Sequence, residues 1–185
     1  PGAHGGKAVA DILFGAVSPS GKLPVTFYRN LAGLGDFTDY SMKNRTYRYF
    51  QGEPLYPFGY GLTYGDVVCT KISAADGLDE ERGVTLEIDV ENNSPTATED
   101  VVEVYIRAAD APHAVPNVSL CGFQRVFLEG GERKTLRIHI GPEAFTVVDD
   151  LGTRRREGRS FVLSAGVSQP DERSCSLLRK RPLVD

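Results

Sequence analysis

Hydrophobic and polar positions alternate along most of the chain after residue 66. The clearest example is residues 84–90, where Val84, Leu86, Ile88 and Val90 fall on one side of an extended chain. This period of two predicts half-buried β-strands, and residues rich in Gly, Pro, Asn and Asp separate them as turns. The pattern predicts seven short strands, at residues 68–72, 84–90, 102–107, 122–128, 135–140, 145–148 and 161–167. Seven strands at hairpin spacing predict an antiparallel β-sandwich of immunoglobulin-like architecture.

The first 65 residues follow a different pattern. Apolar residues lie on one helical face over residues 8–14, and Gly15 stands where a glycine would end that helix. Residues 23–27 predict a short strand, at a sheet edge because Pro24 has no N–H to donate. Tyrosines interleaved with Gly and Pro through residues 28–65 favour a long ordered connection whose rings pack on another surface.

Composition and charge exclude several classes of protein. The net charge of −4 and the pI near 5.5 argue against nucleic-acid binding, which usually needs a basic face. No apolar run reaches the roughly 20 residues needed to span a bilayer, so we expect no membrane contact. Three cysteines and three histidines lack the spacing of a disulfide framework or a metal site, and we expect neither metal nor cofactor. Unpaired cysteines favour a reducing cytoplasm, although the sequence does not fix the compartment.

Three segments of the first region stand out: PGAHGGKAVADILFG at residues 1–15, PSGKLPVTF at residues 19–27, and RTYRYF followed by PLYPFGYGLTY at residues 45–64. In this order they resemble three segments of glycoside hydrolase family 3. Further along, LCGFQRVFL at residues 120–128 is similar to a strand of the fibronectin type III-like domain that follows in these enzymes. The turn at residues 129–132 departs from the usual Lys-Pro-Gly-Glu of the family, which affects only a surface loop.

This resemblance implies a mainly β fold with two parts. Residues 1–65 would be the C-terminal end of an α/β sandwich domain with its connecting segment, and residues 66–185 a fibronectin type III-like β-sandwich. The resemblance also implies a parent enzyme that hydrolyses terminal β-glycosidic bonds of oligo- or aryl β-glycosides with retention. Its partners would be the TIM-like barrel and the rest of the α/β sandwich domain, in the same chain or another.

Retaining glycosidases need two carboxyl groups about 5–5.5 Å apart. The resemblance places both upstream of this segment, so we expect no catalytic residue here and no activity from this chain alone. Acidic residues of the strands, such as Glu87 and Asp89, are expected to face water. Three residues are candidates for substrate contact: His4 beside a helix N-terminus, and Arg45 and Tyr47 in a run that alternates cation and aromatic ring.

The same residues allow structural interpretations. His4 would then be an exposed side chain, while Arg45 and Tyr47 would pin the connection onto both domains. In that case the sandwich braces the enzyme, and Phe58, Tyr60 and Tyr64 lie at the contact between the two parts. A stand-alone carbohydrate-binding or protein-interaction module is the alternative function, because a fibronectin-like fold does not by itself name an activity.

Overall fold

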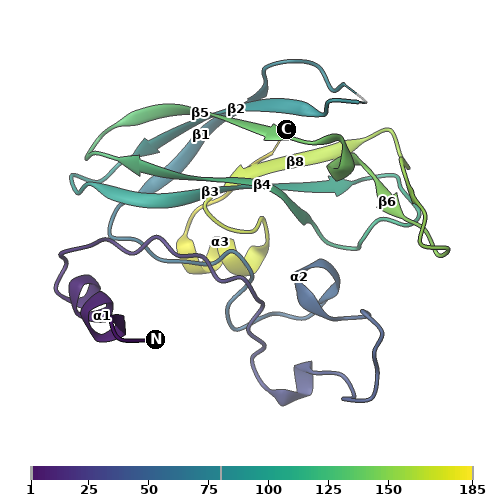
Figure 1. Cartoon of the computed structure of the whole chain (residues 1–185), viewed down its shortest axis with the longest axis horizontal. Helices are drawn as coiled ribbons and strands as arrows, with labels where there is room; N and C mark the ends of the chain where they lie inside the picture. The colour runs from purple at the N-terminus through teal and green to yellow at the C-terminus, as the bar shows by residue number, and fades with distance from the viewer. Residues whose placement is uncertain (1, 80, 185) are drawn as a thin grey trace.

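Two antiparallel β-sheets pack face to face in the computed structural model, which describes residues 2–79 and 81–184 (Figure 1). Pro1, the first residue of the recognised motif, lies outside that range. The first sheet has the order β1-β2-β5, and its strands are β1 (Val67–Ala74), β2 (Val84–Asn92) and β5 (Arg133–Ile140). The second has the order β4-β3-β8-β9, from β3 (Thr98–Ala108), β4 (Ser119–Leu128), β8 (Phe161–Gly166) and β9 (Leu183–Val184). The predicted mainly β sandwich is confirmed.

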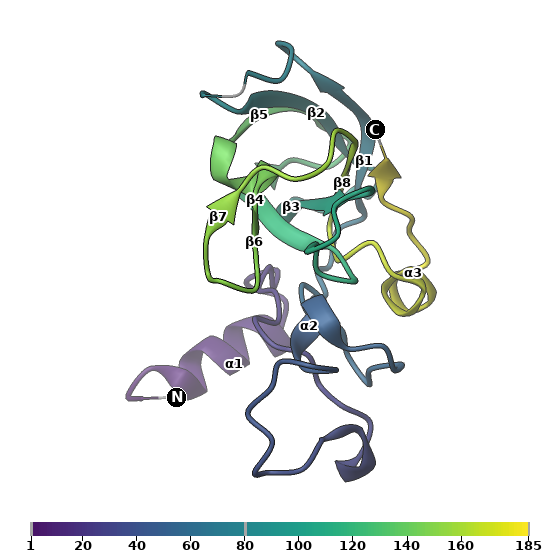
Figure 2. The same ribbon diagram turned by 90° about the vertical axis from the view of Figure 1, so that its right-hand side faces the viewer.

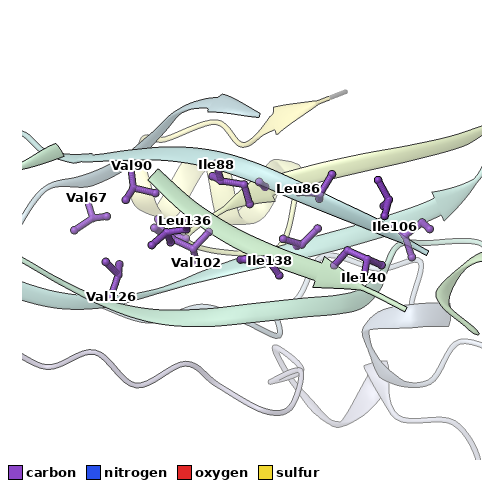
Figure 3. Packing of buried hydrophobic residues seen from close by; sticks show 14 of the residues in the cluster. Val67, Leu86, Ile88, Val90, Val102, Ile106, Val126, Leu136, Ile138 and Ile140 are labelled. Atoms are coloured by element: carbon purple, nitrogen blue, oxygen red, sulfur yellow. The ribbon is translucent and has the colours of Figure 1, made fainter. Parts of the chain in front are cut away.

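The core lies between the sheets and follows from the alternation in the sequence. Every second residue of β2 is buried, and the register with β5 sets Leu86 beside Ile138 and Ile88 beside Leu136. Fully burying such an aliphatic side chain stabilises the fold by about 1.5–3 kcal/mol. Figure 3 shows these side chains interdigitating with residues of β3 and β4, which include Val102, Ile106 and Val126.

Two predicted strands are not formed as expected. Phe145 was placed in a strand but ends a 3₁₀ helix, η2 (Pro142–Phe145), because Pro142 starts a tight turn and the Phe145 ring turns inward against Phe161. Only Val147–Val148 form a strand, β6, which pairs with β7 (Arg154–Arg155). Residues 23–27 make a single bridge, from Phe27 to Tyr56, since prolines in both segments interrupt the ladder.

The predicted first helix is present as α1 (Gly5–Leu13), and Gly15 has φ +76°, a conformation that glycine adopts freely. The tyrosine-rich connection contains η1 (Leu31–Gly33) and one turn of helix, α2 (Thr46–Tyr49). A third helix, α3 (Glu172–Leu178), was not predicted; the Asp171 side chain caps it by accepting a hydrogen bond from Ser174 N. Among the described residues, no helix is long and apolar enough to cross a membrane.

The first 65 residues lie on the outer side of the β4-β3-β8-β9 sheet (Figures 1 and 2). Strand β3 is therefore covered on both faces, by the sandwich core and by this N-terminal segment. That arrangement decides which polar side chains become buried.

Candidate functional site

His4 stands immediately before α1 and is exposed to solvent. It is the N-cap residue by position, yet its side chain makes no capping hydrogen bond. None of the residues of α1 is buried. The His4 carbonyl oxygen accepts a hydrogen bond from Ala8 N at 3.0 Å, while the exposed imidazole is open to contact with another surface.

Arg45 shapes the loop that precedes it. Its Nη2 donates hydrogen bonds to the carbonyl oxygens of Asp36, at 2.9 Å, and Asp39, at 2.6 Å. Hydrogen bonds from Thr38, with the Arg45 charge nearby, hold the pKa of Asp36 below its usual range. The Arg45 guanidinium group therefore binds the backbone of the loop that precedes it.

Tyr47 belongs to an aromatic cluster between the N-terminal segment and β3. Its ring stacks on Phe58 with a centroid distance of 4.0 Å and meets Tyr105 edge-on at 6.4 Å. The Tyr47 hydroxyl accepts a hydrogen bond from Leu120 N of β4 at 3.0 Å, and its carbonyl accepts one from Asn117 Nδ2. The hydroxyl group and the backbone carbonyl of Tyr47 thus both bind the N-terminal segment to the sandwich.

The structure does not bring the three candidates together. His4 lies beside α1, whereas Arg45 and Tyr47 lie at α2, and Figure 1 shows these two helices at opposite ends of the N-terminal segment. Among the described residues, no group of three or more His, Cys, Asp or Glu side chains could hold a metal ion.

A buried ion pair that the sequence does not predict lies where the N-terminal segment meets β3, a contact that we call the junction. Lys22, in the N-terminal segment, lies 2.7 Å from Asp100 Oδ1 of β3 and donates to the carbonyl oxygen of Val167 at 2.7 Å. The two charged side chains are only 10% and 3% exposed. Ser18 adds a hydroxyl network, at 2.8 Å from Thr63 and 2.7 Å from Thr98.

Glu103 is a second buried acid of β3, 4% exposed, and it accepts a hydrogen bond from the Tyr105 hydroxyl at 2.8 Å. Burial raises the pKa of Glu103 to about 7. The expectation that strand carboxylates face water is therefore wrong for Asp100 and Glu103, because the N-terminal segment covers the face that alternation alone assigns to solvent. Glu103 lies inside the apolar run of residues 101–106, which was the available signal for its burial, and Asp100 directly precedes that run.

A groove of about 1340 Å³ lies beside this junction. Its lining includes Tyr47 and Phe50 with prolines, residues of α3 and of the segment that follows it, and Arg107 and Ser164 from β3 and β8. His4 and Arg45 do not line the groove, so it includes only one of the predicted candidates. The mixture of rings, hydroxyls and guanidinium groups is suited to polar ligands with apolar faces.

The N-terminal segment exposes large apolar side chains. The most exposed are Leu13 (74%), Phe14 (88%), Leu31 (83%), Phe37 (91%) and Tyr40 (89%). Two of these residues end α1 and three lie in residues 31–40; so many large, strongly exposed apolar side chains in one segment are typical of a surface that contacts another protein surface.

Comparisons with known proteins agree on one group of enzymes. The model of the glycosyl hydrolase family 3 C-terminal domain matches residues 1–64, and that of the fibronectin type III-like domain matches residues 100–169. A xylan 1,4-β-xylosidase from Xylanibacter ruminicola is 39% identical over 93% of this chain, and a periplasmic β-glucosidase from Salmonella typhimurium is 34% identical over 77%. The chain spans only 20% of the length of each relative. A crystal structure of a family 3 β-glucosidase from Bifidobacterium adolescentis superposes with a TM-score of 0.80 at 26% identity, covering 98% of this chain and 28% of that one.

Proposed function

The chain belongs to glycoside hydrolase family 3, as the C-terminal portion of its β-glucosidase- and β-xylosidase-type members. From this premise we propose that it serves an enzyme that hydrolyses terminal β-glycosidic bonds with retention. In that enzyme this portion braces the catalytic domains and supplies no catalytic carboxylate. Residues 1–65 would complete the α/β sandwich domain, and residues 66–185 would form the fibronectin type III-like brace.

The exposed apolar surface of the N-terminal segment is the observation that carries this proposal. Leu13, Phe14, Leu31, Phe37 and Tyr40 would be costly to leave in water, and the sandwich does not cover them. The rest of the α/β sandwich domain and the TIM-like barrel are the partners that would cover them. The opposite side of the segment is fixed to β3 by Lys22, so the segment would join the catalytic part to the sandwich.

The contacts of Arg45 and Tyr47 support a bracing role for both, since each uses its polar groups within this chain. His4 remains our candidate for a contact with the catalytic part or the substrate. In the assembled enzyme, His4→Ala should raise KM for a nitrophenyl glycoside if His4 touches substrate, and should leave KM unchanged if it does not.

The direct test is hydrolysis of nitrophenyl β-glucoside and β-xyloside by the pure 185-residue chain, with its mass verified. We expect no turnover, because the two carboxylates that a retaining mechanism requires would be elsewhere. Turnover by that single species would overturn the proposal. A chimera tests the brace: this chain replaces the matching portion of the Xylanibacter ruminicola relative, and the melting temperature is compared with that of the same enzyme lacking the portion. The chimera should melt higher.

Carbohydrate binding without hydrolysis is the second candidate function, and the groove beside Tyr47 and Phe50 favours it. Titration calorimetry with xylo- and cello-oligosaccharides distinguishes the two. Binding by the isolated chain that is lost on Phe50→Ala would support the binding function, whereas no heat of binding would leave the bracing role as the better account.

A further inference from the structure

The contact between residues 57–61 and β3 encloses the Glu103 carboxyl group. Gly59 has φ +76° and its backbone lies directly over the Glu103 and Tyr105 side chains; a Cβ added there would overlap both Glu103 Oε2 and the Tyr105 hydroxyl. Two backbone hydrogen bonds fasten the same segment to its neighbour: Gly59 N donates to Leu23 O at 2.8 Å, and Leu23 N donates to Tyr60 O at 2.9 Å. Glu103 is 4% exposed and Tyr105 1% exposed, so solvent scarcely reaches the carboxyl group in this contact.

The charges around Glu103 do not compensate an ionised carboxylate. Lys22 is the nearby cation, but its ammonium group is already bonded to Asp100 and to a carbonyl oxygen. Among the described residues, the other titratable groups that act on the pair are Asp100 on Glu103, and Tyr47 from α2 and Asp171 from the start of α3 on Tyr105; none of them is cationic. Burial, with a smaller contribution from Asp100, raises the pKa of Glu103 to about 7, although Tyr105 and Lys22 act in the opposite direction.

We propose that this contact is a pH-responsive latch between the N-terminal segment and the sandwich, closed when Glu103 is protonated and loosened when Glu103 ionises. A neutral carboxyl group fits beneath Gly59 with one hydrogen bond from Tyr105. An ionised carboxylate needs solvation that the closed contact does not supply, so ionisation favours the open state, in which water reaches the group.

The direction and the size of the pH effect on the closing equilibrium follow from proton linkage. The group has a higher pKa when enclosed than its ordinary value of 4.5, so the contact is strongest below pH 4.5 and weakens as the pH rises through about 7. The difference, 7 − 4.5 = 2.5 pH units, corresponds to a decrease of about 300-fold in the equilibrium constant for closing. The latch rests on contacts within this chain and does not depend on the glycosidase proposal.

Hydrogen exchange on the full chain tests the latch. Protection of peptides that cover residues 18–25 and 55–62 is measured at pH 5, 6, 7 and 8 for the wild-type chain and for Glu103→Gln, which keeps the acceptor for Tyr105 but cannot ionise. The ratio of wild-type to variant opening should rise with pH, from about 4 at pH 5 to about 300 at pH 8, while peptides from β2 change little. Comparing the two proteins at each pH removes the intrinsic pH dependence of exchange. Glu99→Gln on the same strand, whose side chain is partly exposed beside Arg125, is the matched control and should follow the wild type.

A second measurement follows the ionisation of Glu103 in the wild-type chain itself. The carbonyl ¹³C signal of the Glu103 side chain, identified by its loss in Glu103→Gln, should titrate near pH 7. A titration near pH 4.5, or equal exchange in wild type and Glu103→Gln at every pH, would overturn the latch.

Discussion

Removing the ammonium group of Lys22 should destabilise the chain far more than a surface substitution does. In Lys22→Met the methylene stem is largely kept, but Asp100 loses its only ion-pair partner among the described residues while its side chain stays 3% exposed. The carbonyl oxygen of Val167 also loses a 2.7 Å hydrogen bond. Breaking a buried ion pair by removing one partner costs about 3–5 kcal/mol, because the remaining charge is buried and uncompensated.

Urea unfolding followed by far-UV circular dichroism measures this loss, and dichroism is preferred because the chain has no tryptophan. We expect the free energy of unfolding to fall by about 3–5 kcal/mol with little change in the slope m. Lys7→Met is the matched control: Lys7 pairs with Asp11 at 2.5 Å, but the two side chains are 73% and 32% exposed, so the expected loss is about 0.5 kcal/mol or less.

A double variant separates the lost attraction from the cost of an unpaired charge. Lys22→Met combined with Asp100→Leu leaves no buried charge, so it should recover most of the stability that Lys22→Met alone loses. Two results would contradict this account of the ion pair: a loss in the free energy of unfolding for Lys22→Met no larger than that for Lys7→Met, or a double variant less stable than Lys22→Met alone.

Three further predictions concern other contacts. Tyr47→Phe removes the hydroxyl that accepts from Leu120 N and should lower the free energy of unfolding by about 1 kcal/mol in the same urea assay, because an unpaired N–H remains. Burial raises the pKa of the Cys69 and Cys121 thiols to about 12, so iodoacetamide at pH 8 should label both, as read by mass spectrometry, only after the chain unfolds; rapid labelling of the folded chain would contradict this. Phe37 is 91% exposed, so Phe37→Ser should leave the melting temperature of the chain within about 2 °C, yet weaken its association with the catalytic domains in a pull-down.

The sandwich was predictable because one face of most strands meets water. In β2 the alternation is strict, and the buried positions are those that the sequence indicates. In β3 the same reasoning fails: Val102 faces the core as predicted, but Glu103 and Tyr105 are buried as well, since the N-terminal segment covers the second face. The period of apolar residues in a strand indicates whether one or both faces of that strand are apolar. It cannot indicate that a face with polar residues will be covered by another segment of the chain.

The candidate residues show the same limit. The sequence leaves open whether Arg45 and Tyr47 line a subsite or pin the connection. Their partners in this chain, the carbonyl oxygens of Asp36 and Asp39 and the amide of Leu120, are backbone groups that no side-chain pattern encodes. The sequence around Asp100 does not indicate its ion-pair partner, because Lys22 lies 78 positions earlier in the chain. Long-range pairing of this kind is set by the tertiary fold.

The hydrogen bond from Lys22 to Val167 joins residues 145 positions apart, and that separation orders events during synthesis. Val167 directly follows β8, so the ribosome must make all of β8 before Lys22 can donate to this carbonyl oxygen, and until then the N-terminal segment lacks this contact with the sandwich. Contacts of such long range form slowly and leave intermediates prone to aggregation. A product that terminates before residue 167 cannot complete the junction at all. Synthesis past residue 167 therefore decides whether the N-terminal segment can be held on the sandwich by this contact.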